Sequence, residues 1–319
     1  MKVSIIEKTD RRKIEEFIKN NKHVINKFYF STVSAVDLIE NEVDFYSNGD
    51  EKILKYIFCD EELKIIYSLE KLEWDQHIFN RNMWKLNVLV NSKLSSELIS
   101  NFKDDLNKEC DIYKIGHISC QVKAKDYNKT YVLEQCGFRI VDSIIRFGMD
   151  FSIYKNLKNH DNTFVIRKYR DSDYDEVIKV GKEAFTNYPN RFLNEGTFLS
   201  KQCDEMYEEW LVNSTKGFAD LLLVAQLDDS ILGFSTLKNK KIVSDKEYLI
   251  AERQISGVSK ASRGLGLNTK MLNEQLIIAS QYADFFEVGT QIYNYTSQKT
   301  YYKCGLKPID AYYSFHISL

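Results

Sequence analysis

Apolar and polar positions change their spacing several times along the second half of the chain, and each change predicts a new element. Residues 164–170 (FVIRKYR) have a strand pattern, and residues 173–185 repeat apolar side chains at helical spacing, with Asp171 or Ser172 as the expected cap. Residues 199–214 predict a second helix. These elements follow a polar stretch at residues 151–163, which indicates that a folded domain begins at about residue 164.

The pattern then becomes richer in strands. It predicts a hairpin of strands 219–227 and 231–238, a strand at 248–258, a helix ending at about 283, a strand at 285–293, a helix at 295–303 and a last strand at 311–319. Strands alternating with helices favour an α/β (α+β) domain, a mixed sheet flanked by helices.

One pattern occurs twice. EQCGFRIVDSIIRFGMDF at 134–151 parallels YKCGLKPIDAYYSFHISL at 302–319, each with a helix end, a Cys-Gly turn and a long apolar strand. The repeat indicates a tandem duplication. Residues 151–163 lose the apolar periodicity and are interpreted as a linker. We therefore expect two domains, residues 1–155 and 164–319.

Composition and charge narrow the class of protein. A hydrophobic fraction of 44% with a charged fraction of 28% is typical of a folded globular chain. A formal net charge of −2 argues against broad binding to nucleic acid, including tRNA. The N-terminus has no signal-peptide pattern and no apolar run reaches 18 residues, so we expect a cytoplasmic protein that binds no membrane. Six cysteines without a C-x-x-C pair predict neither a zinc site nor a disulfide framework, and no metal.

Residues 262–272 (SRGLGLNTKML) place two glycines before a helical pattern. Neither the Walker A spacing nor the dinucleotide fingerprint fits. Glycines at the start of a helix nevertheless leave backbone N–H groups open to an anion, and Arg263 adds charge. A tight turn produces the same pattern, so the loop alone leaves both interpretations open.

A second motif follows in the predicted helix at 295–303. Asn294 and Tyr301 lie two helical turns apart and therefore on about the same face, with Ser297 between them and Gly305 after them. Asn294 is also a favoured helix cap. A tyrosine on an amphipathic helix is commonly structural, so this motif indicates a function only in combination with the glycine loop.

Together, the strand, the R-G-x-G loop, the helix, the next strand and N-x-x-S-x-x-x-Y-x-x-x-G-L resemble the GCN5-related N-acetyltransferase (GNAT) superfamily. The resemblance implies acetyl-CoA or another short acyl-CoA as co-substrate, with its pyrophosphate at the loop. The side chain that usually stands three residues before the first glycine is replaced by Ala261. The first half has neither the glycine loop nor the tyrosine, because Leu133 stands four residues before Gly137. We expect it to be a degenerate GNAT-like domain.

A narrower resemblance involves residues 190–196, 206–214, 288–306 and 313–319. These stretches are similar to the GNAT subgroup that acylates dTDP-linked amino-deoxy sugars, and residues 72–79 and 133–139 are similar to its N-terminal domain. Where that subgroup often has His and Asp, this chain has Leu193 and Asn194.

The resemblance implies roles for individual residues. Tyr301 is the expected general acid, because a phenol with a pKa near 10 can protonate a leaving thiolate whose pKa is roughly 8.5. Alternation along the strand at 248–258 places Glu252 on one face with Ser256, as that face's only carboxylate, so Glu252 is one candidate base. An ordinary strand glutamate is an equal alternative, and water is a third. Backbone N–H groups near residues 256–258 are the expected oxyanion donors, because similar proteins separate two strands there. The expected acyl-CoA contacts are Ile255, Gly257, Val258, Arg263, Gly264, Leu265, Gly266, Leu267, Asn294 and Ser297.

On the acceptor side, the expected contacts are Arg191, Trp210, Gln291 and His316, although a surface arginine, a packed tryptophan and a structural strand histidine are common. Cys304 has no nearby histidine to activate it, so direct transfer in a ternary complex is favoured over a covalent intermediate.

The sequence thus predicts an acyl-CoA-dependent N-acyltransferase for a dTDP-amino-dideoxy sugar of a surface polysaccharide. The alternatives are a GNAT enzyme for another amine, such as an antibiotic or a protein N-terminus, and an acyl-CoA-binding protein without turnover. The expected partners are small molecules, and the expected state is a monomer or a homodimer.

Overall fold

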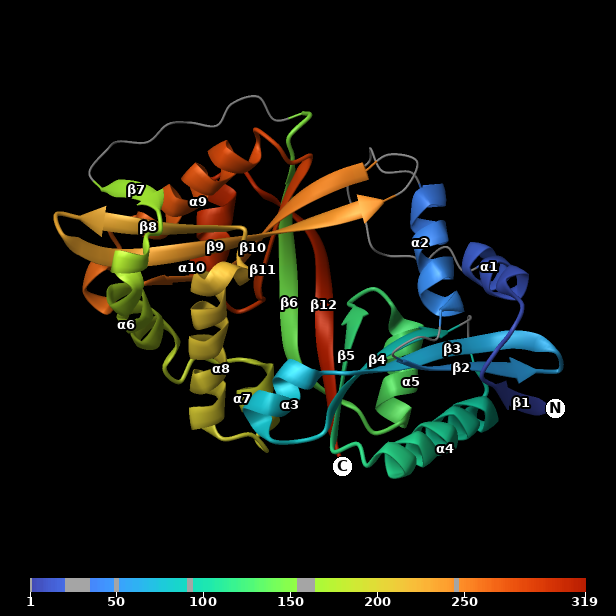
Figure 1. Cartoon of the computed structure of the whole chain (residues 1–319). Coiled ribbons are helices and arrows are strands. Elements are labelled where there is room, and N and C mark those ends of the chain that lie inside the picture. Colours follow the sequence, from blue (N-terminus) through green and yellow to red (C-terminus); the bar gives the residue numbers. More distant parts are fainter. Residues whose placement is uncertain (1, 21–34, 49–51, 91–93, 154–163, 244–246) are drawn as a thin grey trace. The chain divides into compact units, whose positions relative to one another are not determined.

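The chain is a mixed α/β protein (Figure 1). A computed structural model describes residues 2–20, 35–48, 52–90, 94–153, 164–243 and 247–319. Contacts divide the chain into two compact units. Unit 1 comprises Met1–Ser143 and Ala311–Leu319, and unit 2 comprises Ile144–Asp310. The predicted linker lies mostly at residues 154–163, outside the described residues.

Unit 1 contains a sheet in the order β1-β2-β3-β4-β5-β12. Its elements are β1 (Val3–Ile6), α1 (Arg11–Asn20), α2 (Ala35–Ser47), β2 (Lys52–Cys59), β3 (Glu62–Lys71), α3 (Glu73–Phe79), β4 (Met83–Val90), α4 (Ser96–Tyr113), β5 (His117–Lys123), α5 (Tyr127–Gln135), the start of β6 (Arg139–Asp150) and most of β12 (Lys307–Ser318). Alternate β2 residues face opposite sides. Ile57 packs with α4 and α5, and Tyr56 packs with α1 and α2, so helices cover both faces.

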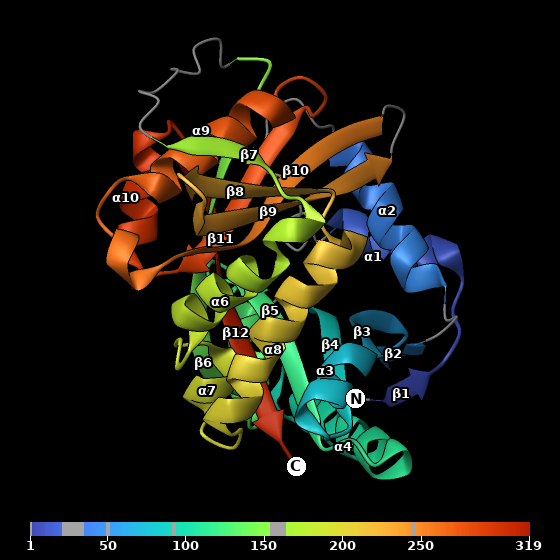
Figure 2. The same cartoon turned by 60° about the vertical axis from the view of Figure 1, so that its left-hand side comes forward.

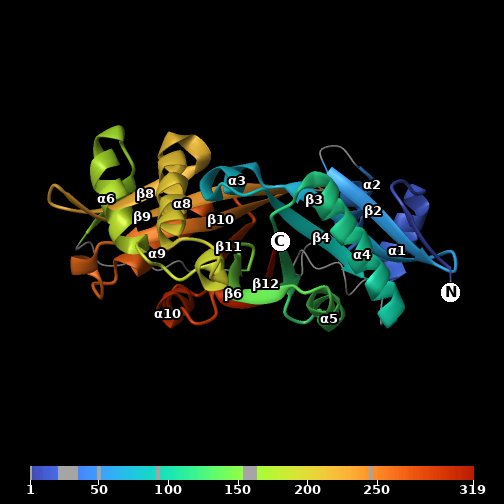
Figure 3. The ribbon, with the colours of Figure 1, turned by 90° about the horizontal axis from the view of Figure 1, so that it is seen from below.

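Unit 2 contains a sheet in the order β6-β11-β10-β9-β8-β7. Its other elements are β7 (Val165–Lys168), α6 (Tyr174–Phe185), α7 (Arg191–Glu195), α8 (Ser200–Asn213), β8 (Leu221–Leu227), β9 (Ser230–Val243), β10 (Glu247–Val258), α9 (Leu267–Ala279), β11 (Phe285–Gln291) and α10 (Tyr295–Lys303). Helices α6 and α8 cover one face of β8, β9 and β10, and α9 and α10 cover the other (Figure 2 and Figure 3). The predicted fold class and the predicted hairpin of β8 and β9 are confirmed.

The two Cys-Gly turns have the same backbone conformation. Gly137 has φ 95° and Gly305 has φ 84°, and the amide after each glycine donates back to Leu133 or Tyr301 at 3.0 Å. The helices before them start alike, because Asp126 and Asn294 each cap an amide three residues on. Leu133 therefore occupies in α5 the position that Tyr301 occupies in α10, which supports the inferred duplication.

Each half of the sequence contributes its closing strand to the sheet of the other half. β12 pairs with β5 from Tyr312–Lys123 to Ser318–His117, and β6 pairs with β11. The contacts therefore divide the chain after Ser143 and before Ala311, whereas the apolar pattern places the boundary at residues 155–164. The roles assigned to the two halves stay predictions.

The expected cap of α6 is wrong by one or two residues. A 3-10 turn occupies Asp171–Asp173, and the Asp173 carboxylate accepts the Arg170 amide at 2.8 Å. The same carboxylate forms a two-pronged ion pair with Arg167, at 2.7 and 2.8 Å. Asp173 therefore ties β7 to the start of α6.

Candidate functional site

A β-bulge interrupts β10 just before its end. Arg253 pairs with Leu237 and Ser256 pairs with Ser235, so two β10 residues stand opposite Thr236 alone. The Thr236 hydroxyl accepts the Ile255 amide and donates to the Ile255 carbonyl, both at 3.1 Å. The bulge is therefore fixed by a side chain from the neighbouring strand.

The bulge also changes which residues share a face of the sheet. Paired residues of an antiparallel sheet lie on the same face. Ser256 therefore lies with Ser235 and Arg253 on the α9 face, and Gly257 faces α6, where a Cβ would lie 2.9 Å from Ala184. The strict alternation that places Glu252 and Ser256 on one face is wrong beyond the bulge.

Strands β10 and β11 separate at the same level. Their parallel pairing runs from Ile250–Phe285 to Arg253–Val288, although β10 continues to Val258 and β11 to Gln291. The sequence resemblance predicts such a separation, and the register confirms it. An extended ligand can enter between strand ends that no longer bond to each other.

A cavity of about 560 Å³ opens at these strand ends. It is lined by β10, the glycine loop, α9, α10, the end of α6 and Tyr188. Arg263, Lys299 and Lys303 are its charged lining residues, and no carboxylate is among the residues that line it. The lining therefore favours an anionic ligand.

The glycine loop brings backbone amides to this cavity. Gly264 and Gly266 have φ values of 87° and 77°, which suit glycine, and α9 starts immediately afterwards. Gly266 is the N-cap residue, and no side chain caps the first turn of α9. Free N–H groups at the positive end of a 13-residue helix are suited to a phosphate.

Most of the predicted acyl-CoA contacts gather around the cavity. Its lining includes Gly257, Val258, Arg263, Gly264, Gly266, Leu267, Asn294 and Ser297. Ile255 and Leu265 are not lining residues, since Ile255 is buried in the bulge and Leu265 is 54% exposed. Asn294 caps α10 as predicted, because its side chain accepts the Ser297 amide at 3.2 Å.

Tyr301 lies behind the lining rather than in it. The side chain is 5% exposed, and its ring packs edge-on against Phe147 with centroids 5.3 Å apart. Burial raises the pKa of Tyr301, while the Arg253 charge and hydrogen bonds with Ser297 and Thr290 oppose that rise. Ser297 lines the cavity, so it connects the buried phenol to the ligand space.

Glu252 occupies an ion-pair network. Its Oε1 accepts from Arg146 at 3.0 Å, and its Oε2 pairs with Lys240 and accepts from Gln254 at 2.8 Å. Arg146 also pairs with Glu287 at 3.1 Å. Both oxygens of Glu252 are therefore engaged, and Glu252 is not among the residues lining the cavity.

The predicted acceptor residues are distributed over several elements. Gln291, at the end of β11, accepts from the Tyr188 hydroxyl at 3.2 Å. Trp210 of α8 stacks on Tyr207 with centroids 6.5 Å apart, and the Arg191 guanidinium lies 4.6 Å from the centre of the Phe192 ring. His316 belongs to unit 1, where it is 2% exposed and packs edge-on against His117.

Three residues that sequence reasoning missed belong to the site. Tyr188 lines the cavity and bonds to both Gln291 and Asn294. Asn268, in the first turn of α9, also lines the cavity and accepts from buried Arg253 at 2.6 Å. A tyrosine after a predicted helix gives no periodic signal. An arginine in a strand predicts exposure, not burial.

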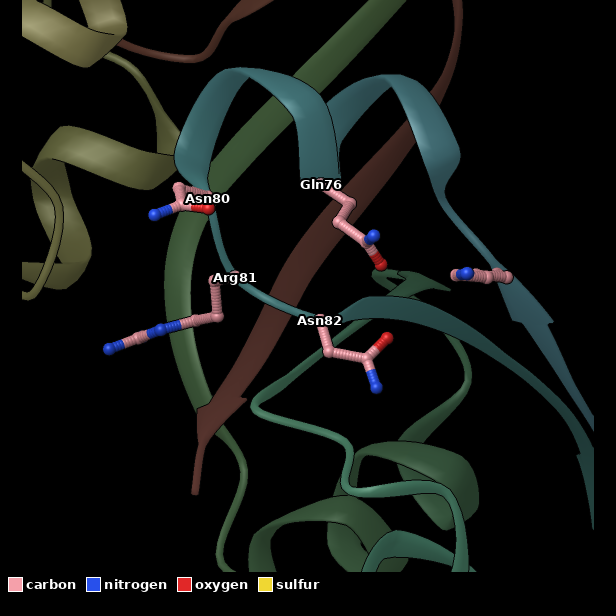
Figure 4. Close-up of a pocket in the computed structure, with 5 residues that line it drawn as sticks. Gln76, Asn80, Arg81 and Asn82 are labelled. Atoms are coloured by element: carbon pink, nitrogen blue, oxygen red, sulfur yellow. The ribbon is translucent and has the colours of Figure 1, made fainter.

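Unit 1 contains a smaller polar pocket lined by Lys71, Gln76, Asn80, Arg81 and Asn82 (Figure 4). Its polar groups support the fold. The Asn82 amide donates to Tyr113 and Lys114 carbonyls at 2.8 and 2.9 Å and accepts from Trp84, and Arg81 donates to Ser318. We therefore regard the unit 2 cavity as the candidate active site.

In the described part of the chain, no helix combines the length and apolar character needed to cross a bilayer.

Comparisons with known proteins indicate the fold. No family model matches the sequence. The chain is 19% identical over 250 residues to the spore coat polysaccharide biosynthesis protein SpsD of Bacillus subtilis (strain 168), covering 75% of this chain and 82% of that protein.

Solved structures give a clearer result. A GCN5-related N-acetyltransferase from Sphaerobacter thermophilus has a TM-score of 0.64 at 13% identity, covering 99% of this chain and 95% of its own. A tandem GNAT protein from the clavulanic acid biosynthesis pathway has a TM-score of 0.54 at 11% identity, covering 99% of this chain and 98% of its own. A glucosamine N-acetyltransferase region of a fungal multi-domain enzyme has a TM-score of 0.62 at 11% identity, covering 99% of this chain and 38% of its own. The chain therefore has the tandem fold of the GCN5-related N-acetyltransferases.

Proposed function

We propose that this chain is an N-acyltransferase that moves an acetyl or short hydroxyacyl group from CoA to the amine of a dTDP-linked amino-dideoxy sugar. The observation that carries acyl-CoA binding is the uncapped start of α9, where two positive-φ glycines meet a cavity with cationic lining residues. GNAT enzymes, whose fold the chain shares, depend on acyl-CoA. Surface polysaccharide biosynthesis is the proposed setting, since a distant relative is named for spore coat polysaccharide.

The cavity chemistry fits a CoA diphosphate. N–H groups of the first turn of α9 supply neutral donors, and Arg263, Lys299 and Lys303 supply positive charge. The separated ends of β10 and β11 then accept the extended thioester arm. Backbone amides near residues 256–258 are the proposed donors to the developing oxyanion.

The proposed reaction is direct. The amine nitrogen attacks the thioester carbon, the new C–N bond forms and the C–S bond breaks. The departing sulfur takes the phenolic proton of Tyr301, and the proton lost by the amine restores the phenol through water. Burial raises the pKa of Cys304 to about 11, so this thiol stays protonated at neutral pH and is unsuited to a covalent intermediate.

The amine loses its first proton to water in this proposal. Glu252 remains the alternative base, but both its oxygens are already bonded to cations or to Gln254. Replacing Glu252 with Gln separates the two cases, because a catalytic base would be lost while a structural ion pair would affect mainly stability.

The identity of the acceptor amine is the more specific part of the proposal. The sequence resemblance favours a dTDP-amino sugar, and Trp210, which is half-buried and stacks on buried Tyr207, is an aromatic side chain of the kind that packs against a base. Gln291 and Arg191 are the proposed polar contacts. A GNAT enzyme for another amine is the alternative, which the glucosamine N-acetyltransferase region of one neighbour keeps open.

A thiol-release assay tests the function. Purified chain is mixed with acetyl-CoA, propionyl-CoA or 3-hydroxybutyryl-CoA, and with dTDP-3-amino and dTDP-4-amino dideoxyhexoses, UDP-amino sugars or free glucosamine. We expect CoA release that requires a dTDP-amino sugar. Turnover with free glucosamine alone would replace the nucleotide sugar by a simpler amine. No release with any pair would overturn the transferase proposal.

A further inference from the structure

Arg253 is a buried cation at the site. Its side chain is on β10, directly before the bulge, and the residue is 3% exposed. Among the residues that the structure describes, it forms no ion pair with a carboxylate. Burial alone lowers the pKa of its guanidinium. Because burying an unpaired charge destabilises a fold, an arginine at this position calls for an explanation.

The guanidinium connects strand β9 to the phosphate-side end of α9. Its Nε donates to the Ser235 hydroxyl at 2.8 Å, and its Nη2 donates to Oδ1 of Asn268 at 2.6 Å. The Ser235 hydroxyl in turn donates to Gln275 at 3.0 Å, further along α9. The first and the third turn of α9 are thus held to the sheet by one polar network.

Asn268 brings this network to the cavity. It is the second residue of α9, it lines the cavity, and it follows Gly266 and Leu267, whose amides face the proposed diphosphate. A charge-assisted hydrogen bond fixes an amide side chain more firmly than a neutral one. Arg253 therefore holds the first turn of α9 through Asn268. It does not line the cavity itself.

The same charge acts on α10. Tyr301 and Cys304 are the titratable groups whose charges interact with Arg253. Tyr301 also bonds with Ser297 and Thr290, and both are neutral. The Nη1 of Arg253 has no hydrogen-bond partner in the described structure, so part of the guanidinium's donor capacity is unused.

We propose that Arg253 is a positioning residue of the transfer site. It fixes the first turn of α9 through Asn268 for binding of the acyl donor. This role rests on the CoA binding of the proposed function and not on the identity of the acceptor.

Two substitutions test this role. Arg253→Lys keeps a positive charge but loses the contacts with Ser235 and Asn268, so we expect CoA affinity to fall about tenfold with kcat within about threefold of wild type. Arg253→Gln loses the same contacts, so we expect a similar loss of affinity. Affinity is measured by calorimetry with CoA alone, and kcat and KM by thiol release.

Two more variants guard against a general folding effect. Asn268→Ala removes the acceptor of Nη2 together with a side chain of the cavity lining, so it should weaken CoA binding at least as much as Arg253→Lys. Arg167→Lys breaks another forked arginine contact in unit 2, away from the cavity, so it should leave CoA affinity unchanged. Urea unfolding of every variant shows whether the fold is kept.

The outcomes are distinct. CoA affinity unchanged in both Arg253→Lys and Asn268→Ala would overturn the positioning role, even if the wild type turns over no sugar. If the wild type binds CoA but turns over no substrate, the result counts against the proposed function. The CoA affinities of the variants then still decide the role of Arg253. If Arg253→Gln fails to fold, Arg253→Lys and Asn268→Ala still decide the positioning role.

Discussion

The Nδ2 of Asn294 donates to the Tyr188 hydroxyl at 3.0 Å, and the same hydroxyl donates to Oε1 of Gln291 at 3.2 Å. One phenol thereby joins the end of β11, the cap of α10 and the loop that follows α6. Because Tyr188 also lines the cavity, it connects the proposed acyl-CoA side of the site with the proposed acceptor side.

Replacing Tyr188 with Phe removes both bonds and keeps the ring. A typical hydrogen bond contributes about 0.5–1.5 kcal/mol to stability, so we expect the loss of two bonds to lower the free energy of unfolding by about 1–3 kcal/mol. The loosened contact with Gln291 should raise KM for the acceptor about two- to tenfold. Steady-state thiol release measures the effect. Tyr282→Phe is the matched control, since it loses a bond to Asn239 far along β9 and should retain wild-type kinetics. An unchanged KM in Tyr188→Phe would remove Tyr188 from the acceptor side.

Replacing Tyr301 with Phe tests the proton donor. Loss of a positioned acid typically lowers turnover by about 10²- to 10⁴-fold, so we expect kcat to fall in that range. CoA affinity should stay the same, because Tyr301 does not line the cavity. Calorimetry with CoA is the control. Retained turnover would reject Tyr301 as the acid and leave the binding site untouched.

Turnover by the wild type should also persist on the alkaline side. Burial raises the pKa of Tyr301 above its ordinary value near 10, so the acid form persists throughout mildly alkaline pH. We predict that kcat does not decline between pH 7 and pH 9.5. A decline centred below pH 9 that is absent from Tyr301→Phe would show a much more acidic phenol and contradict this environment.

Gly266→Ala tests the loop. A side chain in the left-handed region costs roughly 1–2 kcal/mol, and no atom within 4 Å would clash with the new methyl group. The strain should shift the loop and weaken CoA binding about tenfold. Gly196→Ala is a close control, because Gly196 has φ 86° and equally open surroundings at the end of α7. Equal CoA affinity in both variants would show that the loop does not bind the donor.

Asp173→Asn tests the junction of β7 and α6. The Arg167 guanidinium holds the pKa of the Asp173 carboxyl below its usual value. A lowered folded-state pKa stabilises the protein above the unfolded-state value of about 4, and this contribution is lost as the pH falls through the folded-state pKa. We expect the variant to lose about 1–3 kcal/mol at pH 7 and the difference to shrink below pH 4. Urea unfolding at both pH values measures it, and a constant difference would contradict the ion-pair explanation.

The elements of unit 2 could be predicted from the sequence because their patterns are local. β8, β9, β10 and α10 lie within a few residues of the expected ranges, and Asn294 caps α10 as its residue type indicates. These features depend on periodicity and on side chains that bond to their own helix.

Long-range features could not be predicted in this way. Nothing in the periodicity of residues 311–319 shows that β12 pairs with β5, because strand pairing across nearly 200 residues has no local signal. The bulge shifts the alternation of β10, so the face expected for Ser256 was wrong. The burial of Arg253 depends on contacts with β9 and α9 that only the folded chain brings together.

A crystal structure of the chain with bound coenzyme A tests the central claim most directly. We predict diphosphate oxygens within hydrogen-bond distance of the amides that follow Gly264 and Gly266, and the sulfur between the ends of β10 and β11, on the side of Tyr301. Coenzyme A bound in unit 1, or a unit 2 cavity left empty at saturating ligand, would contradict the account.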